Sequence, residues 1–529
     1  MRTEVVAVAV PTAVMLAIGL WGLDRGGMWG DESVTYLVGR RSVPQIWQLL
    51  HGMDAVHGLY YLAMHVVLAV HPGEVALRLP SVCGAAATAG LVAALGVRLA
   101  RPRVGLWAGL IYAITPLTGH YAQEGRSYAI VSAGVAGATL LLVPVVQGRP
   151  RPGWWWRYGG LLALTSLLHE LVVLALCAHA ATLGLARVPR AVWRGWLGAA
   201  GLVGVVVMPL VWVSQLQSGQ VSWLVAPDWA KVEQTVRDFA AGPTGPVFWV
   251  CVALVALGAT ARRTAVVALP LLVLPPAILI SVSQYRPLFH ERYVLYALAG
   301  APLLAAAGTD GVVEFLSRLQ PRGLRLRYGR LGTLTGVLAV TAAFVQCLPL
   351  YRQDRSPAHR PENLAAVAAV AARDIRPGDA VLYLPSSWRL AALTYPKGFR
   401  EARDIALRES GPRSGTLSGL ETGPEQLRRE LAGLKRLWVV GDSKMLNSGR
   451  RPGNPTDRVK LAVVEERFTA RGKYVSGRVT FRLYARRPAV AAAAPQAAHP
   501  TAGTGIESGP GSGSATPVPT TRQPRPARW

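Results

Sequence analysis

Long apolar runs recur along the first 350 residues of this chain, and short segments that carry most of the charge separate them. An α-helix needs about 20 apolar residues to cross the hydrocarbon core of a bilayer. The chain is 51% hydrophobic and only 16% charged, whereas roughly a quarter of the residues of a soluble domain are charged. We therefore predict an α-helical polytopic membrane protein with about eleven transmembrane helices. The expected spans are residues 4–22, 79–97, 104–118, 127–146, 155–168, 170–186, 196–214, 246–260, 264–282, 293–309 and 331–350.

The arginines between these runs indicate the orientation. With the N-terminus in the cytoplasm, every second loop is rich in Arg and lies inside, as the positive-inside rule requires. Residues 155–186 have an alternative, one long tilted helix in place of two short spans that meet at His169 and Glu170. Two spans keep the alternation, so we prefer them, and an odd number of spans then places the chain after residue 350 outside. No small-residue cleavage site follows the first run before Trp21, so this run is read as a retained anchor.

The composition divides the chain into three parts. We expect a membrane domain over residues 1–350, with a first outer loop over 23–77, and a small extracytoplasmic α/β domain over 356–487. Residues 488–529 are rich in Ala, Pro and Thr, which predicts a disordered tail. All four cysteines lie in apolar runs, so a disulfide framework is not expected.

Within the α/β domain, the spacing of apolar residues predicts individual elements. Period-3.6 patterns indicate helices, and short apolar or alternating runs indicate strands. The expected helices are 361–374 and 425–434, and the expected strands are 379–385, 436–442 and 474–486.

Two adjacent carboxylates, Asp31 and Glu32, follow the first expected span in the segment GMWGDES. Neighbouring residues on a helix point about 100° apart, so the two need not share one task. A carboxylate that lies beside the hydroxyl group of a substrate can act as a general base and take the proton of this group. The alternative is that the pair only begins a solvated helix, where acidic residues interact favourably with the helix dipole.

Further polar residues recur where the expected spans reach the outer face, in the segments HYAQEGRSY, LLHELV and RPLFHERYVLY. Arg126 and Arg292 are candidates for an anion clamp, because one guanidinium group can donate two hydrogen bonds to a phosphate. The alternative for each arginine is that it reaches the lipid headgroups from a helix end. Most acidic residues before residue 351 also fall on the outer side, and chemistry on that face would explain this distribution.

Other kinds of site have little support in the sequence. His51, Asp54 and His57 are three residues apart, so on a helix they would approach one face and could bind a divalent metal. We prefer a hydrogen-bonding role for His57. Phosphate-binding glycine loops and Cys-based zinc motifs do not occur, so we expect no metal, no cofactor and no nucleotide. Topology explains most of the arginines, so the net charge of +27 does not indicate a nucleic-acid partner.

The order of these motifs resembles the GT-C superfamily of membrane glycosyltransferases, in the branch of the protein O-mannosyltransferases and the lipid A aminoarabinose transferase. The resemblance covers roughly residues 1–310. The motifs RLPS and YAQEGRSYA are the strongest part of the match. The matching segments are the Asp31-Glu32 pair, HGLYYLAMH at 57–65, ALRLPSV at 76–82, YAQEGRSYA at 121–129, VSWL at 221–224 and ERYVLY at 291–296.

The resemblance implies an integral membrane hexosyltransferase. It would move a mannose-like sugar from a polyprenyl-phosphate donor to an extracytoplasmic glycan, lipid or protein acceptor, with inversion at the anomeric carbon. Asp31 would be the catalytic aspartate and Glu32 the second acidic member of the pair. Arg126, and after it Arg292, would bind the donor phosphate. Substrate contacts are expected from His57, Gln123, Glu124, His169 and Tyr293.

Two other functions stay open at this point. A transporter or flippase of lipid-linked sugars would place ionisable groups at mid-span and would contain paired, broken helices. A noncatalytic cell-envelope scaffold would bind polymer or protein through residues 356–487, and changing Asp31 would then not affect sugar transfer. The polar residues gather at the outer span ends, which favours the enzyme.

Overall fold

The computed structural model describes residues 2–149, 153–240, 245–319, 325–357, 362–447 and 452–488. In the segment 325–331 only the backbone is described. The chain contacts group Met1–Arg486 into one compact unit. The expected disordered tail lies almost entirely outside the described residues.

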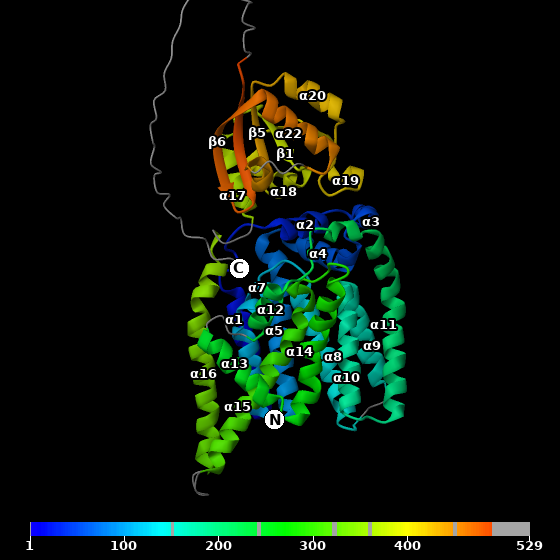
Figure 1. The fold of residues 1–529 in the computed structure, drawn as a ribbon, viewed down its shortest axis with the longest axis vertical. Helices are drawn as coiled ribbons and strands as arrows, with labels where there is room; N and C mark the ends of the chain where they lie inside the picture. The colour runs from blue at the N-terminus through cyan, green and yellow to red at the C-terminus, as the bar shows by residue number, and fades with distance from the viewer. Residues whose placement is uncertain are drawn as a thin grey trace, which may run out of the picture. The chain divides into compact units, whose positions relative to one another are not determined.

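Each of the eleven expected spans lies on one helix or on two consecutive helices (Figure 1). Among the described residues, seven helical segments are long and apolar enough to cross a membrane. The protein is therefore a multi-pass membrane protein, and the crossing of the bilayer by all eleven spans stays a prediction. The helices of this part are α1 (Arg2–Leu20), α5 (Glu74–Leu99), α6 (Pro102–Ile114), α7 (Pro116–Ala122), α8 (Tyr128–Val146), α9 (Trp154–Leu168), η2 (Glu170–Val173), α10 (Leu174–Leu185), α11 (Arg190–Leu216), η3 (Ser218–Val221), α12 (Trp229–Phe239), α13 (Gly245–Gly258), α14 (Arg262–Ser283), η4 (Glu291–Ala299), α15 (Gly300–Arg318) and α16 (Arg325–Asp354).

A single extended residue separates the two short helices α9 and η2. The backbone of His169 has φ −163° and ψ 111°, which a continuing α-helix cannot accommodate. Residues 155–186 therefore form two helical segments, as the alternation of the arginines predicts, and the alternative of one long helix is wrong.

Close backbone contacts between glycines and neighbouring helices hold the N-terminal helices together. A Cβ on Gly96 of α5 would lie 2.7 Å from the Cα of Gly105 on α6. On the same helix, a Cβ on Gly84 would lie 2.8 Å from the backbone nitrogen of Ile130 on α8. Membrane helices associate through such close packing, because lipid is as apolar as a leucine side chain and leaves little hydrophobic driving force. Helix α5 is thus tightly packed on two sides.

The segment between α1 and α5, the expected first outer loop, folds into four short helices. They are α2 (Gly30–Gly39), α3 (Val43–Gly52), η1 (Ala55–His57) and α4 (Gly58–Val70). Helices α2 and α4 pack against each other, and their contact buries Val38, Tyr61 and Met64. The loop is therefore an ordered layer with its own small apolar core.

Residues 362–447 and 452–486 form a mixed five-stranded sheet with helices on both faces. The strand order is β2-β1-β5-β7-β6, in which β1 pairs parallel with β2 and β5, and β7 pairs antiparallel with β5 and β6. Helix α17 (Leu364–Asp374) covers one face, and α20 (Pro424–Ala432) and α22 (Pro455–Arg467) cover the other. The strands are β1 (Ala380–Leu384), β2 (Arg403–Asp404), β5 (Arg436–Asp442), β6 (Phe468–Ser476) and β7 (Val479–Arg486), and β3 (Leu407–Glu409) and β4 (Leu420–Glu421) form a separate pair.

Besides the short strands β2, β3 and β4, two features of this domain differ from the expectation. The alternating segment 474–486 is not one strand but the end of β6 and all of β7, which turn at Gly477 with φ +56°. Period-2 alternation continues across a tight hairpin, so the pattern does not show the turn. Helix α22 was not expected, because the buried Lys460, which pairs with Asp457 and Glu421, interrupts its apolar face.

Replacing Gly96 by Val should destabilise the protein, because the new side chain must push α5 away from α6. We expect the unfolding temperature in detergent to fall by on the order of 5 °C. The matched control is Gly204→Val on α11, where an added Cβ meets no atom within 4 Å. Equal unfolding temperatures for the two variants would contradict the close packing of α5 on α6.

The orientation gives a second prediction. A periplasm-active reporter enzyme fused after residue 357 should be active, because an odd number of spans places this position outside. A cytoplasm-active reporter at the same position should be silent. The reverse pattern of the two activities would show that the spans are miscounted.

Candidate active site

A buried arginine places the segment that carries Asp31. Arg78 on α5 is completely buried and donates to both carboxylate oxygens of Glu32, each at 2.8 Å. It also donates to the carbonyl oxygens of Leu23 at 2.9 Å and Gly27 at 3.3 Å. The guanidinium group therefore holds the loop between α1 and α2 at several points. Glu32 in addition accepts a hydrogen bond from the backbone of Gly125 at 3.0 Å, which joins this loop to the segment between α7 and α8.

Asp31 points away from this ion pair and meets two other guanidinium groups. Arg292 donates to Oδ2 of Asp31 at 3.0 Å, and a terminal nitrogen of Arg126 lies 3.9 Å from the same oxygen. The side chain of Asp31 keeps 30% of its surface exposed, whereas those of Arg126 and Arg292 keep 7% and 9%. Three segments that lie far apart in the sequence thus place one accessible carboxylate between two buried cations.

Each of the two arginines has an unused donor. Arg126 contacts Nε2 of His57 at 2.9 Å and donates to Thr35 at 3.3 Å. The Nε atoms of Arg126 and Arg292 are buried and have no hydrogen-bond partner among the described residues. Buried donors normally find partners, so these two N–H groups are hydrogen-bonding capacity that the described residues leave unused.

His57 is neutral in this arrangement. A guanidinium nitrogen can only donate, so Nε2 of His57 must accept and Nδ1 must carry the proton. Burial lowers the pKa of His57 well below its usual value, and the charge of Arg126 lowers it further. The Nδ1 atom is buried and has no partner in the described part of the chain, so it is a further free donor.

Glu124 supplies a second carboxylate at this place. Its Oε1 lies 4.0 Å from Arg292, and neither of its oxygens has a hydrogen-bond partner among the described residues. Burial raises the pKa of Glu124 to about 7, while Arg292 acts in the opposite direction. The carboxyl group therefore changes its charge close to neutral pH.

Aromatic side chains surround the guanidinium group of Arg292. Its Cζ lies 5.4 Å from the ring centre of Tyr128, 5.5 Å from that of Tyr293 and 6.0 Å from that of Trp223. The ring of His169 lies 5.0 Å from Tyr293. Such rings stabilise the cation and also present flat apolar surfaces beside it. We call these four side chains the aromatic wall.

The structure brings most of the expected residues together. Asp31, Arg126, Arg292, Glu124 and His57 form one connected cluster, and His169 and Tyr293 belong to the aromatic wall. Two expected residues have other contacts: Glu32 pairs with Arg78, and Gln123 donates to the carbonyl oxygens of Gly19 and Trp21, both at 2.8 Å.

Several residues of the site were not singled out from the sequence. Arg78 belongs to the motif RLPS, and an arginine at the edge of an apolar run is itself a signal, because charge in such a run is costly. Trp223 belongs to the motif VSWL. Tyr128 belongs to the motif YAQEGRSYA, whereas Thr35 gives no signal, because a hydroxyl group in an apolar helix is common.

The spacing of His51, Asp54 and His57 does not produce a shared helix face. Helix α3 ends at Gly52, and Asp54 adopts a left-handed conformation with φ +56°. Asp54 accepts a hydrogen bond from Tyr61 at 2.8 Å. Within the described residues, no group of three His, Cys, Asp or Glu side chains is arranged to hold a metal ion.

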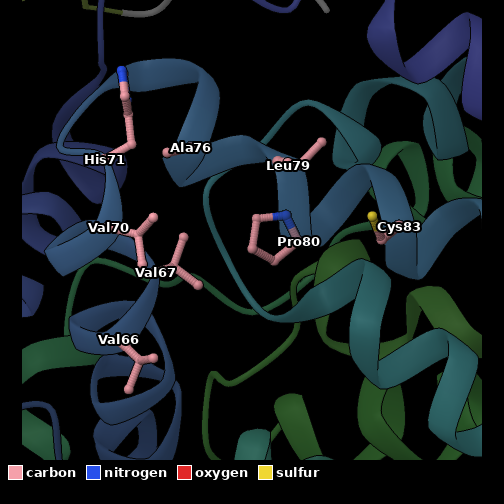
Figure 2. Close-up of a pocket in the computed structure, with 8 residues that line it drawn as sticks. All are labelled: Val66, Val67, Val70, His71, Ala76, Leu79, Pro80 and Cys83. Atoms are coloured by element: carbon pink, nitrogen blue, oxygen red, sulfur yellow. The ribbon is translucent and has the colours of Figure 1, made fainter.

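An apolar groove lies between α4 and α5 (Figure 2). Its volume is about 470 Å³, and His71 is its one ionisable side chain apart from the thiol of Cys83. Figure 2 shows Pro80 and Leu79 of α5 opposite Val67 and Val70 of α4. The lining is suited to hydrocarbon and not to the polar part of a ligand.

The sequence matches no family model and no curated protein. The fold is similar to that of ArnT, an aminoarabinose transferase, from Cupriavidus metallidurans. Its crystal structure in the apo state has a TM-score of 0.56 at 12% identity and covers 90% of this chain and 97% of that chain. The structure of the same protein bound to undecaprenyl phosphate has a TM-score of 0.55 at 12% identity, with the same coverage of both chains.

The apo crystal structure of an oligosaccharyltransferase from Archaeoglobus fulgidus has a TM-score of 0.49 at 12% identity and covers 92% of this chain and 75% of that chain. The likeness to ArnT shows that this chain has the GT-C fold, as the resemblance of its motifs predicts.

Replacing Glu124 by Gln should stabilise the protein more at high pH than at low pH. The pKa of Glu124 is about 7 in the folded chain, against 4.5 as its ordinary value. The folded chain then binds more protons between these two values, so the wild type loses stability as the pH rises through this window, and the Gln variant does not. The gain in unfolding temperature should be larger at about pH 8 than at about pH 5.

The control for this comparison is Glu233→Gln, which also removes one carboxylate but lies on the exposed surface of α12. Equal gains at the two pH values for the Glu124 variant would show that burial does not hold this group near neutrality.

Proposed function

We propose that this protein is an integral membrane glycosyltransferase that takes its sugar from a polyprenyl-phosphate donor and passes it to an acceptor on the outer face. One observation carries the proposal: the accessible carboxylate of Asp31 lies between two buried guanidinium groups, each with an unpaired Nε–H. This is the set of groups that a sugar phosphate and an acceptor hydroxyl require. The likeness in fold to ArnT supports the choice, because one of the ArnT structures contains undecaprenyl phosphate.

In the proposed reaction, Asp31 takes the proton of the acceptor hydroxyl. The acceptor oxygen attacks the anomeric carbon, and the bond between this carbon and the phosphate oxygen breaks. The electron pair leaves with the polyprenyl phosphate. One displacement of this kind inverts the configuration at the anomeric carbon, so inversion belongs to the proposal.

Arg126 and Arg292 would hold the leaving phosphate. The phosphate becomes more negative as the bond breaks, so hydrogen bonds from the two guanidinium groups strengthen toward the transition state. Loss of one such contact is expected to raise the barrier by about 3 kcal/mol. When phosphate binds, it also competes with Asp31 for Arg292, which frees the carboxylate for its task as a base.

The aromatic wall and the unpaired polar atoms are suited to a sugar. Flat rings pack against the apolar face of a pyranose, and its hydroxyl groups can pair with Glu124 and with Nδ1 of His57, both of which are buried and unpaired among the described residues. We propose a hexose, mannose-like in its hydroxyl pattern, as the transferred sugar.

Other predicted residues take supporting roles in this proposal. Glu32 and Gln123 would position the site, because Arg78 occupies both oxygens of Glu32 and the end of α1 accepts from the amide nitrogen of Gln123. We expect the polyprenyl chain to lie along an apolar groove such as the one between α4 and α5. The proposal includes no cofactor, because the two guanidinium groups supply the positive charge that a metal ion would otherwise bring. An assay with and without a chelator tests this point.

The position of the charged residues favours an enzyme over a transporter. Arg126 follows the end of α7, Asp31 begins α2, and Arg292 begins η4. These are helix ends, whereas a transporter places its ionisable groups near the middle of the membrane. A noncatalytic scaffold has no need of an accessible carboxylate between two unpaired guanidinium donors.

The proposal is tested by sugar transfer from a panel of polyprenyl-phosphate sugars to candidate acceptors with the purified protein. Asp31→Asn should lower kcat by on the order of 100-fold or more, and Arg126→Ala by on the order of 100- to 1000-fold. The matched controls are Asp24→Asn and Arg25→Ala, whose residues are exposed in the loop before α2, and both should transfer as the wild type does. Full turnover by the Asp31 and Arg126 variants would leave the scaffold function as the better explanation.

A further inference from the structure

The helix that carries Asp31 has no cap of its own. The residue before α2 is Trp29, which offers no side-chain acceptor to the first amide groups of the helix. Such amide groups normally pair with a Ser, Thr, Asp or Asn side chain at this position. Here the backbone N–H of Gly30 donates instead to Oε2 of Glu362 at 3.1 Å. A residue of the α/β domain thus caps the helix one position before Asp31.

A second contact from the same domain holds the preceding loop. The backbone N–H of Met28 donates to the hydroxyl group of Tyr395 at 2.7 Å, and this hydroxyl group in turn donates to Glu74 at the start of α5. On the C-terminal side of α2, Arg41 donates to the carbonyl oxygens of Thr416 at 2.8 Å and Leu417 at 3.1 Å. Helix α2 is therefore bound to the α/β domain at both ends.

Two glycines in this loop make the contact possible. A Cβ on Gly30 would lie 2.7 Å from Oε2 of Glu362, and a Cβ on Gly27 would lie 2.5 Å from the Cβ of Ala365. A side chain at Gly27 would collide with rigid atoms of Ala365, and a side chain at Gly30 would displace the carboxylate of Glu362 from its contact. The glycines of GMWGDES are thus explained by the approach of residues 362–365 and not by unusual backbone angles.

The loop is held from two sides by complementary groups. Arg78 of the membrane part takes its carbonyl oxygens, and Glu362 and Tyr395 of the α/β domain take its amide groups. The carboxylate of Glu362 is 13% exposed, and its other oxygen lies 3.8 Å from Arg478. Since Asp31 follows Gly30 directly, any shift of this amide group moves the carboxylate relative to Arg292.

We infer that Glu362 is a positioning residue for the proposed transfer: through the backbone of Gly30 it holds Asp31 in reach of the acceptor, so the α/β domain contributes to the reaction rate and not only to recognition. This inference rests on the proposed function. It assigns to the domain a role at the reacting group itself.

The test compares three variants of the full-length protein in the transfer assay. Glu362→Ala removes the cap and should lower kcat by about 10-fold, the order expected for a lost cap, with little change in the donor KM. Glu362→Gln keeps an acceptor oxygen for Gly30 and should retain kcat within about 3-fold, because it loses only the charge interactions with the helix dipole and with Arg478. Gly30→Ala displaces the same contact from the other side and should resemble Glu362→Ala. The control is Glu466→Ala, whose side chain is 71% exposed on α22.

A second measurement does not depend on activity. Hydrogen exchange of the peptide that covers residues 24–36 should become faster in Glu362→Ala and stay near the wild-type rate in Glu362→Gln. Unchanged kcat and unchanged exchange in Glu362→Ala would overturn the inference while leaving the proposed function intact. An inactive wild type with every donor would instead remove the proposed function, and the exchange data would still report on the cap. If Glu362→Ala disturbed the whole fold, its unfolding temperature would be lower than that of the wild type. Glu362→Gln would then not restore kcat and the exchange rate of residues 24–36 in particular.

Discussion

The ion pair between Arg78 and Glu32 is the interaction on which the site depends. Both side chains are completely buried, and removal of one partner from a buried pair is expected to cost about 3 to 5 kcal/mol, because an uncompensated charge remains. Such pairs are rarely a net source of stability. The pair is better understood as a device that specifies one arrangement. Arg78 also binds several loop carbonyl oxygens, and a lysine, with one compact charge and three donors, could not make this set of contacts.

Next to this fixed pair lies a cluster of charged side chains whose hydrogen bonds are incomplete. Two guanidinium groups face the carboxyl groups of Asp31 and Glu124, yet donors on Arg126, Arg292 and His57 and both oxygens of Glu124 remain unpaired among the described residues. Burying polar groups without partners costs free energy. A folded chain tolerates that cost where a ligand later completes the network. The contrast between the fully paired Glu32 and the unpaired Glu124 separates the part that holds the loop from the part where we propose that the substrate binds.

The sequence predicts the helices of the membrane part well, because apolar runs and arginine-rich loops carry a direct physical signal. Every expected span lies on helix, and the break at His169 follows from the alternation of the arginines. The gathering of Asp31, Arg126 and Arg292 could be predicted from the resemblance of the motifs, because each is expected at the outer end of a helix. The division of work within the pair Asp31-Glu32 could not, since it depends on which face of α2 meets Arg78. The same holds for the links to Glu362 and Tyr395, which join segments that share no local pattern.

The length of chain between Gly30 and Glu362 has a consequence for biosynthesis. The two residues are 332 positions apart, and a ribosome makes the chain from the N-terminus at about 5 to 20 residues per second. Asp31 is therefore synthesised on the order of half a minute before Glu362, which caps its helix. The later helices are synthesised during this interval. Asp31 is the first acidic residue of the site to be translated, but its helix is capped only after Glu362 has been synthesised.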